Sequence, residues 1–116
     1  MLHQKLFIMK TLKFRHYLVP LVLSGEKTST WRLFDDKNIS IGDQVELQQF
    51  VTNKPFGQAS IVDVVEKSFG ELNDSDKTGH EDFNNDEEMY ETYSRYYKTK
   101  VNEKTKLKII RFKLSD

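Results

Sequence analysis

The 116-residue sequence predicts one α+β domain, in which mixed or antiparallel strands form a barrel and two or three short helices are inserted among them. The length suffices for a single modest hydrophobic core. The predicted elements follow the order strand, helix, three strands, helix, strand. The three middle strands lack the helical crossovers of a parallel βαβ sheet, and this favours an α+β barrel over an α/β fold.

Five strands are predicted from short runs of β-branched, aromatic and other apolar residues that turn residues separate. Residues 1–8 are a possible N-terminal extension, because Met9 is also a natural start of the domain. In the last strand the alternation of apolar residues slips between Ile109 and Ile110, which indicates a bulge or a change of environment. In chain order, the predicted strands cover residues 5–14, 28–33, 44–51, 58–66 and 105–114.

Residues 16–24 predict the first helix, with Pro20 near its beginning, where proline is tolerated, and Gly25 at its end. The acidic stretch from residue 70 to 76 predicts a loop or short helical turns. His16 lies at the start of this helix and is expected to have a local structural role, whereas the role of His80 stays open.

The second helix is predicted from about residue 86 to 98, with Asn85 as N-cap and Glu88 as its capping-box partner. Helical spacing gathers tyrosines on one face of this helix. Such a stripe usually packs in a core, although tyrosine rings also stack on nucleic-acid bases. The stripe consists of Tyr90, Tyr93 and Tyr97, and Tyr96 belongs with them to the group considered for stacking.

Positive and negative charges balance, at 18 residues each, which argues against a protein that grips nucleic acid through bulk charge alone. The charges are nevertheless segregated. Residues 71–91 carry nine acidic residues against one lysine, whereas residues 92–116 carry eight basic residues against two acidic ones. If the basic C-terminal part lies beside the basic N-terminal third, the two form a local positive face.

Several classes of protein are disfavoured by the composition. No apolar run approaches the roughly 20 residues that span a bilayer, and the first residues lack the features of a secretory signal. The chain has no cysteine, and its histidines (His3, His16 and His80) lack metal-ligand spacing. We therefore expect a cytoplasmic protein, a monomer or weak dimer, with no membrane segment, metal or cofactor.

Polar side chains are concentrated where the first helix gives way to the second strand. Strand alternation places Thr28, Thr30 and Arg32 on one face of this strand. Lys27 falls on the opposite face by the same rule. It joins the other three only if the chain bends at Gly25, which glycine permits.

These residue types suit an anion or a carbonyl group. Arg32 offers a planar fork of donors to a phosphate, a carboxylate or a developing oxyanion. Lys27 serves either as a point charge or, with a lowered pKa, as a base that activates Thr30 as a nucleophile. In the alternative interpretation, the threonines are ordinary strand formers and the two basic residues are surface charges. Trp31 lies on the other face of the strand and is expected to pack in the core.

The pattern Gly25-x-Lys27-x-x-Thr30-x-Arg32, at the end of a short helix, resembles the signature of ASCH (activating signal cointegrator homology) domains. Residues 41–47 and 108–112 resemble two further strands of the same family. The similarity extends from about residue 9 to residue 114, nearly the whole chain. It implies that residues 1–116 form a single PUA-like β-barrel whose cleft binds RNA or a nucleotide-like ligand.

Some small bacterial members of this family are amidohydrolases that remove the acetyl group from N4-acetylcytidine with a lysine, a threonine and a glutamate. By motif position, the first two correspond to Lys27 and Thr30. Residues 80–83 resemble the Glu-Gly-Phe element that supplies the glutamate, which makes Glu81 the candidate. Asp82 stands where glycine is usual and is the alternative to Glu81.

Two functions are therefore predicted from different classes of protein, and the fold does not decide between them. The first is a module that binds RNA or a modified nucleoside, and the second is an amidohydrolase that acts through Lys27, Thr30 and Glu81. A scaffold that binds only protein is a third possibility. In the first two cases the ligand-binding residues are Gly25, Lys27, Thr28, Thr30 and Arg32.

Overall fold

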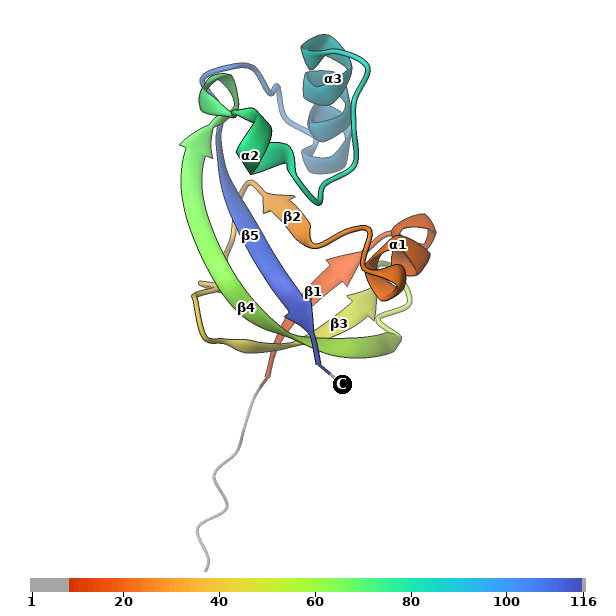
Figure 1. The fold of residues 1–116 in the computed structure, drawn as a ribbon. Coiled ribbons are helices and arrows are strands. Elements are labelled where there is room, and N and C mark those ends of the chain that lie inside the picture. The colour runs from red at the N-terminus through yellow and green to blue at the C-terminus, as the bar shows by residue number, and fades with distance from the viewer. Residues whose placement is uncertain (1–8, 116) are drawn as a thin grey trace, which may run out of the picture.

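A computed structural model describes residues 9–115 and shows a five-stranded mixed sheet that curls into an open barrel (Figure 1). The strand order is β1-β3-β4-β5-β2. β1 and β3 are parallel, whereas every other neighbouring pair is antiparallel. The predicted α+β barrel is thus confirmed. The strands are β1 (Lys10–Phe14), β2 (Ser29–Arg32), β3 (Gln44–Gln49), β4 (Pro55–Ser68) and β5 (Lys106–Leu114).

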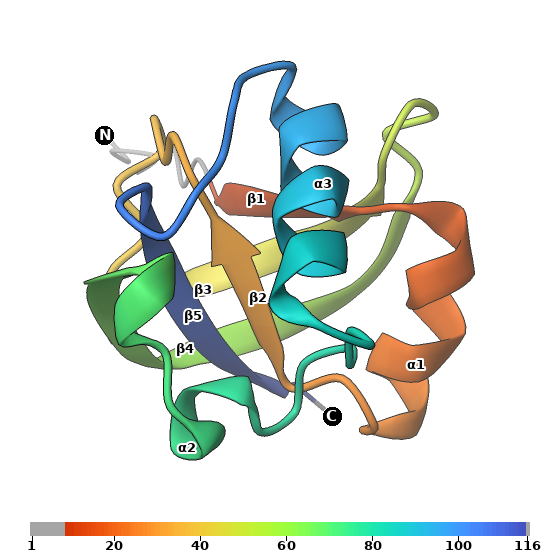
Figure 2. The same cartoon turned by 90° about the horizontal axis from the view of Figure 1, so that it is seen from above.

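Short helices connect the strands, and the longest, α3, lies over the sheet on the side of β2 (Figure 2). Gly25 has a φ of 84° and ends α1, as predicted from the sequence. The predicted loop or helical turns around residues 70–76 form two short helices. The helices are η1 (His16–Leu18), α1 (Val19–Ser24), η2 (Phe69–Glu71), α2 (Asp74–Lys77) and α3 (Asp86–Tyr97).

The capping of α3 agrees with the prediction only in part. The side chain of Asn85 accepts a hydrogen bond from the Glu88 amide at 2.8 Å, as expected for the N-cap. The Glu88 carboxylate, however, accepts from the backbone and side chain of Asn84 rather than from the backbone of Asn85. The reciprocal half of the predicted capping box is therefore wrong, because the carboxylate reaches one residue further back.

Strand β4 is longer at both ends than the predicted strand at residues 58–66. Its first residue, Pro55, pairs with Gln48 of β3, so that the strand begins three residues before the predicted start. β1 begins at Lys10 among the described residues. The possible extension at residues 1–8, with the first residues of the predicted strand at 5–14, lies outside the described residues.

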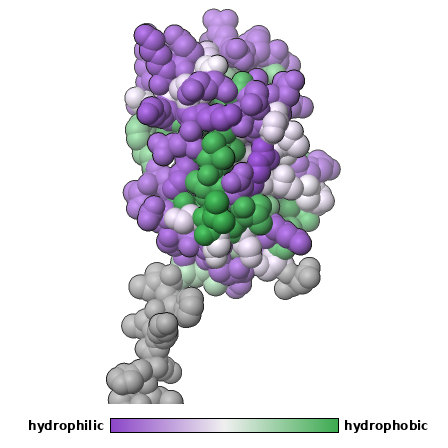
Figure 3. Space-filling model, turned by 60° about the vertical axis from the view of Figure 1, so that its left-hand side comes forward, coloured by the Kyte–Doolittle hydropathy of each residue, from purple (hydrophilic) through white to green (hydrophobic). Residues whose placement is uncertain are grey.

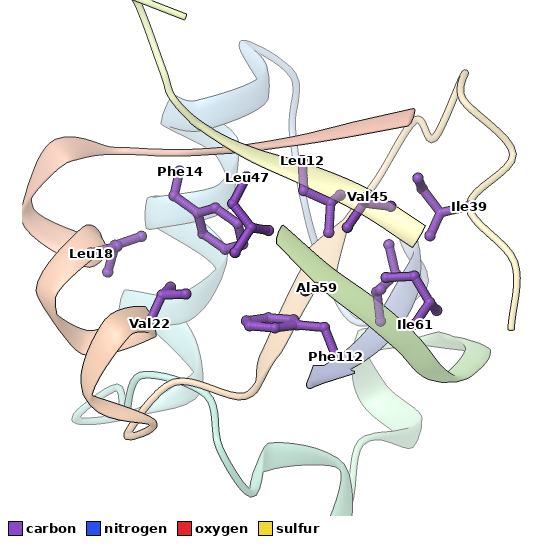
Figure 4. Close-up of a cluster of buried hydrophobic side chains, with 11 residues drawn as sticks. Leu12, Phe14, Leu18, Val22, Ile39, Val45, Leu47, Ala59, Ile61 and Phe112 are labelled. Carbon is purple, nitrogen blue, oxygen red and sulfur yellow. The ribbon is translucent and has the colours of Figure 1, made fainter. Parts of the chain in front are cut away.

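The hydrophobic core is divided between the two faces of the sheet. One cluster fills the inside of the barrel (Figure 4), and the other lies between the sheet and α3. Ile110 belongs to the first and Ile109 to the second, so β5 is buried on both faces. The predicted slip in the alternation of apolar residues between Ile109 and Ile110 therefore reflects a change of environment. The bulge of this strand pair lies on β4 instead, between Ile61 and Asp63.

The outer side of the sheet carries an apolar patch among hydrophilic side chains, on the side of the molecule where β4 lies (Figure 3). Val62 of β4 is an exposed aliphatic side chain, as is Ile41, which precedes a glycine bonded to the carbonyl of Ile61. Within residues 9–115, no helix is long and apolar enough to cross a membrane. The same part of the chain contains no group of three His, Asp or Glu side chains suited to a metal ion.

Candidate functional site

The two edge strands of the sheet, β1 and β2, are joined by side chains instead of a backbone ladder. Arg32 of β2 donates from Nη2 to the carbonyl of Lys13 in β1 at 2.7 Å. Lys37 donates from Nζ to the carbonyl and hydroxyl of Thr11 at 3.0 and 2.7 Å. These bonds satisfy backbone groups that an open sheet edge leaves unpaired. A cavity of about 290 Å³ opens along this seam, between the edge strands and α3, and is called the seam cavity below.

The seam cavity combines basic and aromatic side chains. Five basic residues line it against three acidic ones, so the site has an excess of positive charge in a chain that is neutral overall. The basic residues are Lys13, Arg15, Lys27, Arg32 and Lys37, and the acidic ones are Asp35, Asp36 and Glu81. The aromatic residues are Phe14, Trp31, Phe34, Phe50, Tyr93, Tyr96 and Tyr97.

The positive charge of the seam cavity comes from the N-terminal third of the chain alone. The C-terminal basic residues do not join it, contrary to the arrangement considered from the sequence. Lys108 forms an ion pair with the partly buried carboxylate of Asp35 at 2.6 Å. Arg111 donates to backbone carbonyls around α2, including those of Ser75 and Thr78 at 2.6 and 2.8 Å. Both residues thus have internal partners.

Lys27 reaches the seam cavity because the chain bends after α1. Gly25 adopts the left-handed conformation, and the Lys27 amide then donates to the carbonyl of Leu21 at 3.0 Å. The Lys27 residue is 3 % exposed. Its ammonium donates to the Ser29 carbonyl at 2.7 Å and forms an ion pair with Glu81. The bend at Gly25, which the sequence analysis required for Lys27 to join the other candidate residues, is therefore present.

The ionisation of the pair reflects both burial and the local excess of positive charge. Burial lowers the pKa of Lys27, and the Arg32 guanidinium acts in the same direction, while Glu81 opposes them. Burial by itself raises the pKa of the Glu81 carboxyl, but His80 and Lys27 outweigh it and hold the pKa below its ordinary value. A positive site lowers the pKa of an acid and of a base alike.

A loop that precedes α3 brings Glu81 to the cavity. The Gly79 carbonyl accepts from the Thr28 and Ser29 amides at 2.9 and 3.2 Å, which holds the loop against the start of β2. Gly79 has a φ of 78°, and a Cβ there would lie 2.1 Å from the Thr28 hydroxyl. Only glycine fits this contact. Glu81 lines the seam cavity, whereas Asp82 is exposed and does not.

Two of the predicted ligand-binding residues lie outside the lining of the cavity. Thr28 is exposed and packs against Gly79, and Gly25 acts through the bend that it permits. Thr30 and Arg32 do line the cavity and share one face, as strand alternation predicted. Arg32 donates from Nε to the Thr30 hydroxyl at 3.1 Å. Among residues 9–115, no hydrogen bond joins the hydroxyl of Thr30 to Lys27.

His80 is a site residue whose role the sequence left open. Its ring stacks on that of Trp31, with centroids 3.8 Å apart, and both residues are buried. Nδ1 lies 3.0 Å from the Glu81 carbonyl and therefore carries the proton, so that Nε2 accepts from the Tyr93 hydroxyl at 2.9 Å. Burial and the nearby Lys27 lower its pKa to about 4, which keeps the ring neutral at pH 7.

The aromatic residues around His80 have a structural role. Trp31 is buried in the core cluster beneath α3, as predicted, and Tyr93 packs in the same cluster. Tyr96 and Tyr97 are partly buried and line the seam cavity. The helical spacing of the tyrosines thus produced both a core stripe and part of the cavity wall. No local pattern in the sequence pointed to the pairing of His80 with Tyr93.

Comparison with known proteins shows similarity at the level of the fold. No family model matches the sequence, and no curated protein matches it. The ASCH domain from Lactobacillus crispatus JV V101 has a TM-score of 0.67 and 15% identity, covering 90% of this chain and 79% of the other. Protein EF3133 from Enterococcus faecalis V583 has a TM-score of 0.72 and 15% identity, covering 95% and 82%.

A mutant of the ASCH protein from Zymomonas mobilis is also similar, with a TM-score of 0.60 and 16% identity over 91% of this chain and 68% of the other. Identity at this level shows the fold alone. The open barrel with helices inserted among its strands is thus common to this chain and to two ASCH structures from different organisms. The chain has the ASCH-domain fold.

Proposed function

We propose that the chain is a member of the ASCH family that binds a nucleotide, free or within RNA, in the seam cavity. The observation that carries this proposal is the excess of basic residues, set among aromatic rings, around one cavity of a neutral chain. Basic groups attract phosphate, and aromatic faces stack on any base. The ASCH-domain fold supports the proposal at the level of analogy.

The size and chemistry of the cavity favour a ligand unit about as large as one nucleoside. A volume of about 290 Å³ lies at the lower end of small-molecule sites. The Arg32 guanidinium suits phosphate oxygens. The carboxylate of Glu81 can accept a hydrogen bond from an exocyclic amine, as acidic side chains do from cytosine. The proposal includes the cytoplasmic location and the monomer or weak dimer expected from the sequence.

Calorimetric titration with nucleoside monophosphates and with the matching nucleosides tests this function. The monophosphates should bind more tightly than the nucleosides, and the difference should shrink at high salt because salt screens the phosphate contacts. Arg32→Ala should weaken monophosphate binding. Lys54→Ala is the matched control, since Lys54 is exposed and lies outside the cavity lining. If neither ligand binds the wild-type protein, the proposal is wrong.

One arrangement also favours the amidohydrolase as a second candidate. Lys27, Thr30 and Glu81 line the same cavity, and burial lowers the pKa of the lysine, as a general base requires. In this reaction Lys27 first gives up its ammonium proton, for which Glu81 is the nearby acceptor. The neutral amine then takes the proton of the Thr30 hydroxyl as that oxygen attacks the acetyl carbon, and returns it to the nitrogen of cytidine as the C–N bond breaks. Water then hydrolyses the acetyl ester. Lys27 must first exchange a present partner, Glu81 or the Ser29 carbonyl, for Thr30.

Release of cytidine from N4-acetylcytidine tests this second candidate. The wild-type protein should release cytidine above background, and both Lys27→Ala and Thr30→Ala should lose this activity. Asp82→Asn is the control, because Asp82 lies outside the seam cavity. Absence of release, or equal release by both active-site variants, would leave nucleotide binding as the remaining function.

A further inference from the structure

Three aromatic side chains are exposed around the mouth of the seam cavity. Tyr17, Phe34 and Phe50 are 52 %, 71 % and 48 % exposed, whereas the other exposed large hydrophobic residues described are aliphatic. Phe34 and Phe50 line the cavity. The Tyr17 hydroxyl lies 2.6 Å from that of Tyr96, which also lines it. The exposed rings are therefore gathered at one site of the surface.

Two of these rings, Phe34 and Phe50, lie on opposite sides of the C-terminal end of α3. Phe34 belongs to the turn after β2 and packs edge-on against Tyr97, with centroids 5.9 Å apart. Phe50 follows β3, and its amide donates to the Phe14 carbonyl at the far end of β1. Figure 2 shows the turn after β2 and the β3–β4 connection on the two sides of α3. The distance between Phe34 and Phe50 is comparable to the length of β1, which is about 16 Å.

Basic side chains accompany the rings on both sides. Lys37, three residues after Phe34, bonds to Thr11 near the start of β1. At the other end, the Arg15 guanidinium lies between two rings, 5.0 Å from the centre of Phe50 and 4.1 Å from that of Tyr96. Rings with basic groups beside them are the arrangement by which proteins hold single-stranded nucleic acid.

The carboxylates at the start of α3 do not oppose this arrangement. Three acidic residues occupy the first turn of α3, while the mouth of the cavity lies at its C-terminal end. The helix has 12 residues, so its ends are about 18 Å apart. This is more than the Debye length at physiological salt, about 8 Å. A polyanion that crosses the mouth is thus screened from these carboxylates.

We propose that the mouth of the seam cavity holds single-stranded RNA, with one nucleotide in the cavity and the neighbouring bases stacked on Phe34 and Phe50. This inference rests on the proposed nucleotide binding and specifies that the bound nucleotide belongs to a single strand of RNA. Stacking on exposed rings needs unpaired bases, which a duplex does not present. A peptide would use the rings as apolar contacts, without need of the basic residues beside them.

Affinities for a mononucleotide, a single-stranded RNA hexamer of the same base and a duplex of the same length test the inference. The hexamer should bind at least tenfold more tightly than the mononucleotide, because each stacked base adds to affinity. The duplex should bind more weakly than the single strand. Equal affinities for hexamer and mononucleotide would overturn the inference and leave nucleotide binding intact. Absence of mononucleotide and hexamer binding would overturn both.

Substitutions at the two rings separate stacking from simple hydrophobic contact. Phe34→Leu and Phe50→Leu keep an apolar side chain but remove the ring, and each should weaken hexamer binding about tenfold. Mononucleotide binding should weaken less than hexamer binding, because the basic residues of the cavity still hold the phosphate. Phe34→Tyr should retain wild-type affinity for the hexamer. Ile41→Ala, at an exposed residue outside the cavity lining, is the control. Wild-type hexamer affinity in both leucine variants would show that the rings hold no bases.

Discussion

The ammonium of Lys27 and the carboxylate of Glu81 form an ion pair in the seam cavity, although 54 residues separate them in the chain. Glycine makes both halves of the contact possible. Gly25 permits the bend that turns Lys27 inward, and Gly79 permits the close contact with Thr28 that docks the loop carrying Glu81. The charges of the candidate site are therefore held by two backbone conformations that other residues rarely adopt.

Glu81→Gln should destabilise the protein, because it leaves the buried Lys27 ammonium without its counter-ion. Removal of one partner of a buried ion pair costs several kcal/mol, and the partial exposure of Glu81 reduces the expected loss to about 2 kcal/mol. Urea denaturation measures the change. Asp82→Asn removes the neighbouring exposed charge and should change the free energy of unfolding by less than about 0.5 kcal/mol. Equal changes in the free energy of unfolding in the two variants would contradict the role of Glu81 as the counter-ion of Lys27.

Gly79→Ala should destabilise the protein more than Gly42→Ala. Both glycines have a positive φ, so each substitution costs about 1 kcal/mol of backbone strain. At Gly79 the new Cβ would also lie 2.1 Å from the Thr28 hydroxyl, whereas at Gly42 nothing lies within 4 Å. Thermal or urea denaturation of the two variants compares them. Thr28→Ala should restore part of the stability of Gly79→Ala, and no restoration would show that the clash is elsewhere.

Stability should fall as the pH drops from about 6.5 towards 4, because His80 is buried neutral. Its pKa is lowered from 6.5 to about 4 in the folded protein, so in this window the unfolded chain binds a proton that the folded chain does not. The contribution, about 3 kcal/mol, is present above pH 6.5 and lost as pH falls through the folded pKa. Glu81 and Asp35 have lowered pKa values, and their contributions are lost only at more acidic pH.

Urea midpoints at about pH 7 and pH 5 check this dependence in the wild-type protein and in His80→Gln. The variant should be less stable at the higher pH, since it loses the stacking on Trp31, and the difference from wild type should narrow at the lower pH. Parallel pH dependences in the two proteins would mean that His80 is not the group that titrates.

Arg32→Lys should weaken the seam between β1 and β2 even though it keeps the charge. The guanidinium donates to Thr30 and to the Lys13 carbonyl at once, which a single ammonium on a flexible stem does not reproduce. We expect a loss of about 1–2 kcal/mol in the free energy of unfolding. Arg95→Lys, at an exposed residue of α3, is the matched control and should have little effect. An equal effect of the two substitutions would contradict this role of Arg32.

Much of the fold was accessible from the sequence because its signals are local. The end of α1 at Gly25, the N-cap at Asn85 and the shared face of Thr30 and Arg32 depend on a few neighbouring residues each. Strand ends were less accurate. The residues that begin β4 have turn-like composition but pair with β3, since pairing partners decide where a strand begins.

The remaining parts of the site depend on contacts between distant segments. The position of Glu81 followed only from the family resemblance, and the sequence did not indicate that His80 stacks on Trp31 and bonds to Tyr93. Asp35 and Lys37 follow the predicted strand at residues 28–33 and were not candidate site residues, yet they line the cavity because this segment folds back on β1. Local sequence patterns do not encode such contacts, because only the tertiary fold brings the residues concerned together.

The indole N–H resonance of Trp31 provides the most direct measurement of nucleotide binding in the seam cavity. Trp31 is the only tryptophan and lines the cavity, so one signal in a two-dimensional proton–nitrogen spectrum reports on the site. Titration with a nucleoside monophosphate should shift this signal saturably in the wild-type protein and in Lys54→Ala, and should need higher ligand concentrations in Arg32→Ala. An unmoved Trp31 signal, or an equal saturable shift in Arg32→Ala, would contradict the account.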